Sequence, residues 1–63
     1  MKFELYEIWS EDESGHQELI DTTRSITEAR DIAQLELDTG AFYVTIYRET
    51  EDGDLELVEE FEL

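Results

Sequence analysis

Four segments of the chain carry the hydrophobic pattern of β-strands. Residues 3–9 and 42–48 are rich in aromatic and β-branched side chains, and residues 18–23 form a shorter segment of the same kind. Residues 10–16 are polar and contain a glycine, which predicts the loop of a hairpin. Residues 55–63 alternate apolar and acidic side chains, as in a strand with one buried face. The preceding Asp52-Gly53 is typical of a tight primed turn.

Residues 26–38 show the period of an amphipathic helix. The apolar stripe consists of Ile26, Ala29, Ala33 and Leu37. Ser25 and Glu28 match a capping box, in which the hydroxyl accepts the amide of the third helical residue and the glutamate reaches back. Gly40 stands where a left-handed C-terminal cap belongs. Because the stripe includes two small alanines, we expect the helix to lie close to a sheet.

The order of elements is ββαββ, which predicts an α+β fold: a single-layer four-stranded antiparallel sheet with one helix packed on one face. A right-handed crossover through the helix makes the second and third strands run the same way. The strand orders 2-1-3-4 and 1-2-4-3 both satisfy this rule, and we prefer 2-1-3-4 because the two most apolar strands are then central. All 63 residues form one small domain in this prediction. The predicted core is Ile26, Ala29, Ala33, Leu37, Phe42, Val44, Ile46, Leu57 and Phe61.

One helix covers only one face of such a sheet, so the other face is left open. Strict alternation assigns to the open side Tyr43, Thr45, Tyr47, Glu56, Val58, Glu60 and Glu62. Leu55 and Leu57 are expected on the helix side together with Glu59, whose charge among apolar positions argues against a regular strand. In residues 3–9 both alternating sets are apolar, so the pattern leaves open which of them faces the helix.

The charge balance limits the choice of partners. Nineteen acidic residues face four basic ones, and the formal net charge is −15. DNA, RNA and anionic lipid repel such a chain, so we expect no direct nucleic-acid or membrane binding. With no apolar segment of membrane-spanning length and no basic n-region before an apolar stretch, we expect a cytoplasmic protein. The absence of cysteine removes disulfides and Cys-ligated zinc and does not determine the redox compartment. The complementary partner is a basic protein, including one that itself binds nucleic acid.

Residues that carry enzyme chemistry are scarce. The single histidine, His16, lies in a predicted loop, and the serines and threonines have no second histidine to activate them. The acidic segments 11–15 and 51–54 do not follow the spacing of an EF-hand calcium loop. We therefore predict a non-enzymatic protein with no catalytic residue, no cofactor and no dedicated metal site.

The acidic surface has three interpretations: adaptation to high salt, solubility, and mimicry of a nucleic-acid backbone. Alternate glutamates on a strand lie about 6.7 Å apart, a charge density comparable with that of DNA phosphates. In size and charge the chain is similar to small acidic phage-encoded inhibitors of host nucleases, a resemblance of composition that assigns no residue. Our functional hypothesis is an acidic protein-binding module, with a DNA-mimic inhibitor as its most specific form.

The alternative is a structural or adaptor protein whose tyrosine-bearing sheet face docks to a partner or forms a weak homodimer. Its charge then serves solubility or halophilic adaptation. The candidate partner-binding residues of the sheet are Glu56, Glu60, Glu62, Tyr43 and Tyr47. Those of the helix are Glu28, Asp31 and Leu35, which lie off its apolar stripe.

Overall fold

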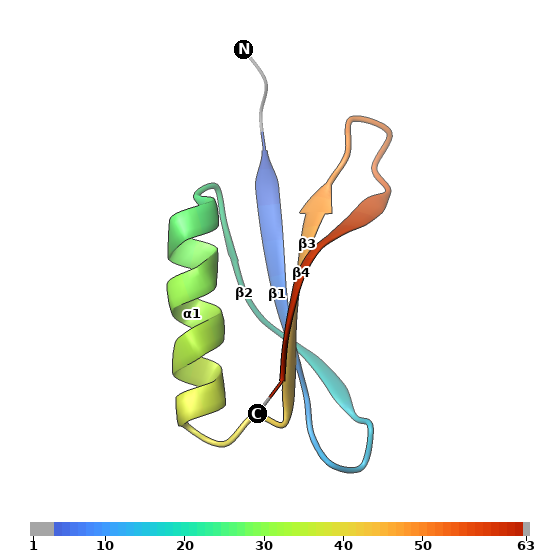
Figure 1. Cartoon of the computed structure of the whole chain (residues 1–63). Helices are drawn as coiled ribbons and strands as arrows, with labels where there is room; N and C mark the ends of the chain where they lie inside the picture. The colour runs from blue at the N-terminus through green and yellow to red at the C-terminus, as the bar shows by residue number, and fades with distance from the viewer. Residues whose placement is uncertain (1–3, 63) are drawn as a thin grey trace.

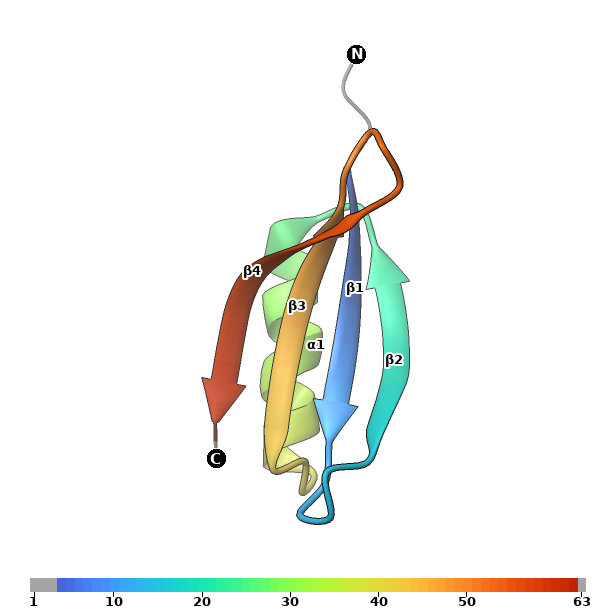
Figure 2. The same cartoon turned by 90° about the vertical axis from the view of Figure 1, so that its right-hand side faces the viewer.

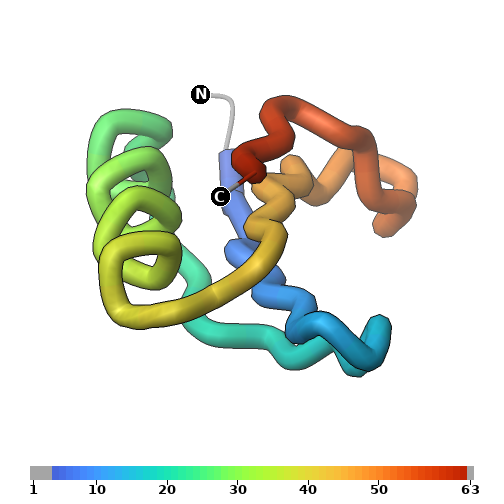
Figure 3. Tube along the Cα trace, turned by 60° about the horizontal axis from the view of Figure 1, so that its bottom comes forward, coloured from blue at the N-terminus to red at the C-terminus, as the bar shows by residue number. Residues whose placement is uncertain are grey.

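The computed structural model describes residues 4–62 and has the predicted ββαββ order (Figure 1). The elements are β1 (Leu5–Glu11), β2 (Gln17–Thr23), α1 (Ile26–Asp38), β3 (Tyr43–Glu49) and β4 (Leu55–Glu62). The strands form one antiparallel sheet in the order β2-β1-β3-β4, which confirms the predicted fold class and the preferred strand order. Helix α1 lies against one side of this sheet, behind β1 and β3 in Figure 2, and forms a separate layer in Figure 3.

The N-terminus of α1 is closed by side-chain oxygens. The Ser25 hydroxyl accepts a hydrogen bond from the Glu28 amide at 3.2 Å, which confirms one half of the predicted capping box. The Ser25 amide donates to the Thr23 hydroxyl at 3.3 Å. Thr23, the last residue of β2, therefore accepts the hydrogen bond that a full capping box assigns to the Glu28 side chain.

The C-terminus of α1 is closed by backbone hydrogen bonds. The Ala41 amide donates to the Glu36 carbonyl at 2.9 Å, and the Gly40 amide donates to the Leu37 carbonyl at 3.2 Å. These two bonds form a Schellman motif. Gly40 has a φ of 116°, a backbone conformation that is strained for residues with a Cβ atom. This confirms the predicted glycine cap.

The hydrophobic core lies between α1 and the side of the sheet that faces it. Its buried members are Tyr6, Ile8, Ala29, Ala33, Leu37, Val44 and Ile46, with Ile26, Ile32, Ala41, Val58 and Phe61 packed around them. Ala29 and Ala33 are fully buried, as expected for a helix that lies close to a sheet. In β1 it is Tyr6 and Ile8 that face the helix, which decides the question that the sequence pattern left open.

Phe42 lies outside the core, contrary to the prediction. Strand β3 begins one residue later, at Tyr43, and Ala41 packs against the core from the connection. The Phe42 side chain is consequently 49% exposed. It lines an open depression of about 400 Å³ together with Asp12, Glu13, Ser14 and Gly40.

A β-bulge in β4 also displaces Leu57 from the predicted core. The pairing passes from Ile46–Glu59 to Tyr47–Leu57, so Val58 is an extra residue. Val58 packs against the core, whereas Leu57 lies on the opposite side of the sheet and is 50% exposed. The predicted position of Leu57 is therefore wrong, and the irregularity indicated by Glu59 is confirmed.

The two hairpins are closed by loops of the same construction. In residues 12–16 and 50–54 the amide of the first residue donates to the carbonyl of the fifth, and the amide of the fourth donates to the carbonyl of the first. The fourth residue is Gly15 in one loop and Gly53 in the other, with φ values of 86° and 87°. A type I′ turn needs a positive φ at both central positions, and a type II′ turn needs one at the first. Asp52 does not have one, so the predicted primed turn is not formed.

Candidate protein-docking surface

No other element of the described chain covers the side of the sheet that is turned away from α1 (Figure 2). We call this side the open face. Residues paired across strands share a side, so the register assigns its members. The open face comprises Leu5, Glu7, Trp9 and Glu11 of β1, Gln17, Leu19 and Thr22 of β2, Tyr43, Thr45, Tyr47 and Glu49 of β3, and Leu55, Leu57, Glu60 and Glu62 of β4. Four predicted partner-binding residues, Tyr43, Tyr47, Glu60 and Glu62, are brought together on it.

Tyr43 lies among three carboxylates of the open face. It is directly opposite Glu11 of β1 and Glu62 of β4, and Glu60 is its diagonal neighbour. The Tyr43 hydroxyl is hydrogen-bonded to the Glu60 carboxylate. This bond, with partial desolvation and the charges of the three carboxylates, raises the pKa of Tyr43 to about 12. The phenol therefore stays a neutral donor that orients the Glu60 carboxylate.

Trp9 has a similar carboxylate partner. Its Nε1 donates a hydrogen bond to Oε1 of Glu7 at 3.0 Å, and both residues lie on the open face of β1. Trp9 is paired with Thr45, which is buried although it belongs to the open face. Two aromatic residues of this face, Tyr43 and Trp9, thus each have a carboxylate at their polar edge.

Leucines extend the apolar part of the open face beyond the aromatic residues. Leu57 lies opposite Tyr47, and Leu55 lies opposite Glu49. Both leucines, and Leu19 on the edge strand β2, are about half exposed. Exposed apolar side chains with a polar rim are typical of protein-interaction sites.

The open face carries unbalanced negative charge. Its five acids are Glu7, Glu11, Glu49, Glu60 and Glu62. Within residues 4–62, none of the strand residues on this face is Lys or Arg. The Arg30 guanidinium, on α1, is 3.1 Å from the Glu59 carboxylate, so this cation lies on the helix side of the sheet. Arg48, which pairs with Glu56 and Glu4, is also on that side.

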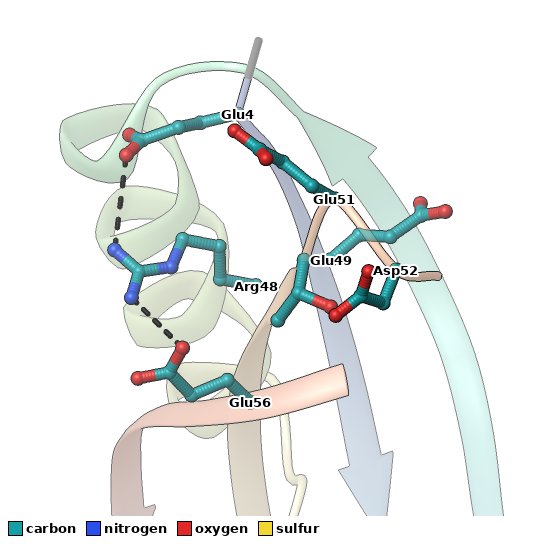
Figure 4. A pocket seen from close by; sticks show the side chains of 7 residues that line it. Glu4, Arg48, Glu49, Glu51, Asp52 and Glu56 are labelled. Carbon is teal, nitrogen blue, oxygen red and sulfur yellow. Dashed lines mark hydrogen bonds and ion pairs between the residues drawn. The ribbon is translucent and has the colours of Figure 1, made fainter. Parts of the chain in front are cut away.

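Glu56 is not on the open face, contrary to the prediction. Before the bulge the alternation of β4 is reversed, and Glu56 is paired with Arg48 on the helix side. Arg48 Nη2 lies 3.0 Å from Glu56 Oε2, and Arg48 Nη1 lies 3.7 Å from Glu4 Oε1 (Figure 4). The hydrogen bond to Glu56 and the charge of that residue raise the pKa of Arg48. Glu56 therefore belongs to an ion pair within the sheet. The surrounding depression, of about 390 Å³, is lined by Glu4, Arg48, Glu49, Thr50, Glu51, Asp52 and Glu56.

The three predicted helix residues form a separate surface. Glu28, Asp31 and Leu35 are exposed on α1, and the leucine is 60% exposed. Because α1 covers the opposite side of the sheet, a partner seated on the open face does not reach them (Figure 1). The predicted binding residues are therefore divided between two sides of the molecule.

The loop that contains His16 is organised by Asp12. The Asp12 carboxylate accepts hydrogen bonds from the Ser14 hydroxyl, the Ser14 amide and the His16 amide, at 2.6, 2.9 and 3.0 Å. These bonds, led by the Ser14 hydroxyl, hold the pKa of Asp12 below its ordinary value.

In the described part of the chain no group of three or more His, Asp or Glu side chains is arranged to hold a metal ion. No helix there is long and apolar enough to cross a membrane.

Glu7, Trp9, Glu11, Leu55 and Leu57 are among the open-face residues that were not predicted to bind a partner. In β1 a usable signal exists, because Glu7 and Glu11 share the phase of Trp9, and two acids in one alternating set indicate its exposed side. In β4 the signal is Glu59, which marks the point at which the alternation reverses.

The open face therefore offers hydrogen-bonded carboxylates beside aromatic rings, an arrangement suited to holding cationic side chains.

No protein-family model matches this chain, and no curated protein or solved structure is significantly similar to it.

Proposed function

We propose that this protein is a non-enzymatic binding module that docks onto a basic partner protein through its open face. The observation that supports this most directly is the composition of that face. Partly exposed aromatic side chains and half-exposed leucines adjoin five carboxylates, with no Lys or Arg at its strand positions in residues 4–62. Aromatic anchors within a polar rim resemble binding hot spots, and an unneutralised acidic face favours a basic one.

We favour a nucleic-acid-binding protein as the partner, with this module acting as a DNA-mimic inhibitor. Glu60 and Glu62 alternate along β4, about 6.7 Å apart. Glu11 lies in the same cross-strand row as Glu62, two strand spacings away, or about 10 Å. Duplex DNA carries one phosphate per about 3.4 Å of axis on each strand, so a groove lined by Lys and Arg could accept these three carboxylates in place of phosphates. Glu56 is no part of this group.

The test compares two double charge reversals that change the net charge equally. One is Glu60→Lys with Glu62→Lys on the open face, and the other is Glu28→Lys with Asp31→Lys on α1. Tagged wild-type protein and both variants are used to retain proteins from host lysate, with washes of rising salt and with duplex DNA as competitor. We expect basic proteins to be retained by the wild type and the helix variant, to be lost by the open-face variant, and to be displaced by DNA.

Two other results would overturn parts of the proposal. Equal losses by both variants would mean that binding depends on net charge and not on the open face. Retention that is insensitive to DNA but is lost on truncating Tyr43 and Tyr47 would reject mimicry and support the adaptor alternative. A homodimer is a less suitable occupant, because it would bring the carboxylates around Tyr43 of two copies together.

A further inference from the structure

We infer that the open face recognises arginine side chains in preference to lysine, at two aromatic–carboxylate pairs, Trp9–Glu7 and Tyr43–Glu60. This inference rests on the proposed function, because it names the chemistry by which the basic partner is held. The occupant is an arginine-bearing surface or segment of that partner protein. The charge of the open face is the reason for a cationic occupant, and the two pairs are the reason for arginine.

The two pairs have the same construction. In the first, Trp9 Nε1 donates a hydrogen bond to Glu7 at 3.0 Å. In the second, Glu60 is the diagonal cross-strand neighbour of Tyr43 and the hydrogen-bond partner of its hydroxyl. A carboxylate has two oxygens, and this bond occupies one of them, so the second oxygen remains free to accept from a ligand. Trp9 and Tyr43 are both partly exposed.

The pairs lie close enough to act on one segment. Trp9 is opposite Thr45, two residues along β3 from Tyr43 on the same side of the sheet. Diagonal neighbours of this kind are separated by about 7–8 Å. Glu11, which lies opposite Tyr43 and two residues from Trp9, adds a carboxylate between the two pairs. A segment with alternating cationic side chains could therefore engage both pairs at once.

Arginine fits this arrangement better than lysine for a geometric reason. A planar guanidinium stacks on an aromatic ring and, with its fixed fork of N–H donors, also reaches a carboxylate at the ring edge. A lysine ammonium is a compact, strongly hydrated charge and does not form the planar stack. Each pair thus offers two simultaneous interactions to arginine and mainly one to lysine.

The test uses two synthetic peptides of equal length and charge, one alternating Gly with Arg and the other alternating Gly with Lys. Trp9 is the single tryptophan of the chain, so its fluorescence reports binding at the open face directly. We expect the arginine peptide to change Trp9 emission and to bind roughly threefold or more tightly than the lysine peptide. Glu7→Gln and Glu60→Gln should each reduce this preference, and the charge-matched Glu28→Gln on α1 should leave it unchanged.

The outcomes separate the two proposals. If both peptides change Trp9 emission with equal affinity, the arginine inference fails while docking at the open face stands. If neither peptide affects Trp9 and the lysate partners are lost only by the helix variant, the proposed function itself fails. If Glu28→Gln lowers the preference as much as Glu7→Gln does, the effect is one of net charge, and the aromatic–carboxylate pairs are not the cause.

Discussion

At the scale of single residues, Tyr43 links the conformation of the open face to its charge. Its hydroxyl is hydrogen-bonded to Glu60, and with two further carboxylates nearby the pKa of Tyr43 rises to about 12. Ionising this phenol would place another negative charge in an acidic cluster. The neutral hydroxyl instead orients Glu60, as Trp9 orients Glu7.

Replacing Glu60 with Gln should lower the pKa of Tyr43 toward its ordinary value of 10.0, because the largest cause of the shift is removed. A raised pKa in the folded state means that the associated stability is complete below pH 10.0 and is lost as the pH rises toward about 12. We expect this alkaline loss to be smaller in Glu60→Gln. An NMR titration of the Tyr43 ring measures the pKa, with Glu28→Gln as the control. An unchanged Tyr43 titration in Glu60→Gln would contradict the assigned pairing.

At the scale of elements, the contact between α1 and the sheet depends on small side chains. Ala29 and Ala33 are fully buried against β-strands whose inward residues include the fully buried Ile8, Val44 and Ile46. Close packing leaves no room there for a larger or charged group. The bulge at Val58 acts at the same scale, because one extra residue decides which side of the sheet Leu57 occupies.

Ala33→Asp should destabilise the fold by about 2–5 kcal/mol, because it buries an unpaired charge beneath the helix. The control is Leu35→Asp, which places the same charge on the exposed side of α1, where the leucine is 60% exposed, and should change stability by less than about 1 kcal/mol. Urea unfolding of the two variants and the wild type gives the comparison. Equal stability of Ala33→Asp and the wild type would refute the observed packing.

At the scale of the whole molecule, the net charge of −15 is unevenly arranged. On the helix side Arg30 and Arg48 partly neutralise the acids with which they pair, Glu59, Glu56 and Glu4. The open face has no such cation among its strand positions in residues 4–62. Repulsion among its carboxylates is therefore relieved by salt or by a cationic partner.

Raising NaCl from about 10 mM to about 1 M should increase the melting temperature by a few degrees, since the Debye length falls from about 30 Å to about 3 Å. The increase should be smaller in the double variant Glu60→Lys with Glu62→Lys, which removes repulsion from the open face. Thermal unfolding followed by circular dichroism at each salt concentration tests this. A melting temperature independent of salt would show that the carboxylates are too dispersed to repel. Unfolding at all but molar salt would instead support halophilic adaptation.

Much of the fold could be predicted because its signals are local. The bounds of α1 follow from its apolar stripe, Ser25 and Gly40, and the structure reproduces them. The strand order followed from crossover handedness and from placing the most apolar strands in the centre. The candidate site was predicted only in part: Tyr43, Tyr47, Glu60 and Glu62 share the open face, but Glu56 does not.

The sequence by itself determined the elements, their order, most of the core and the large negative charge, because each depends on neighbouring residues or on composition. Only the tertiary structure decided which side of the sheet each carboxylate occupies. A bulge depends on the fit of one strand to another, and the side-chain period of a strand is two, so the one extra residue at Val58 exchanges the sides of Leu57 and Glu56. The hydrogen bond between Trp9 and Glu7, and the partial exposure of both residues, likewise follow from the packing of Ile8 beneath α1. The alternation within β1 did not predict which set of its residues faces the helix.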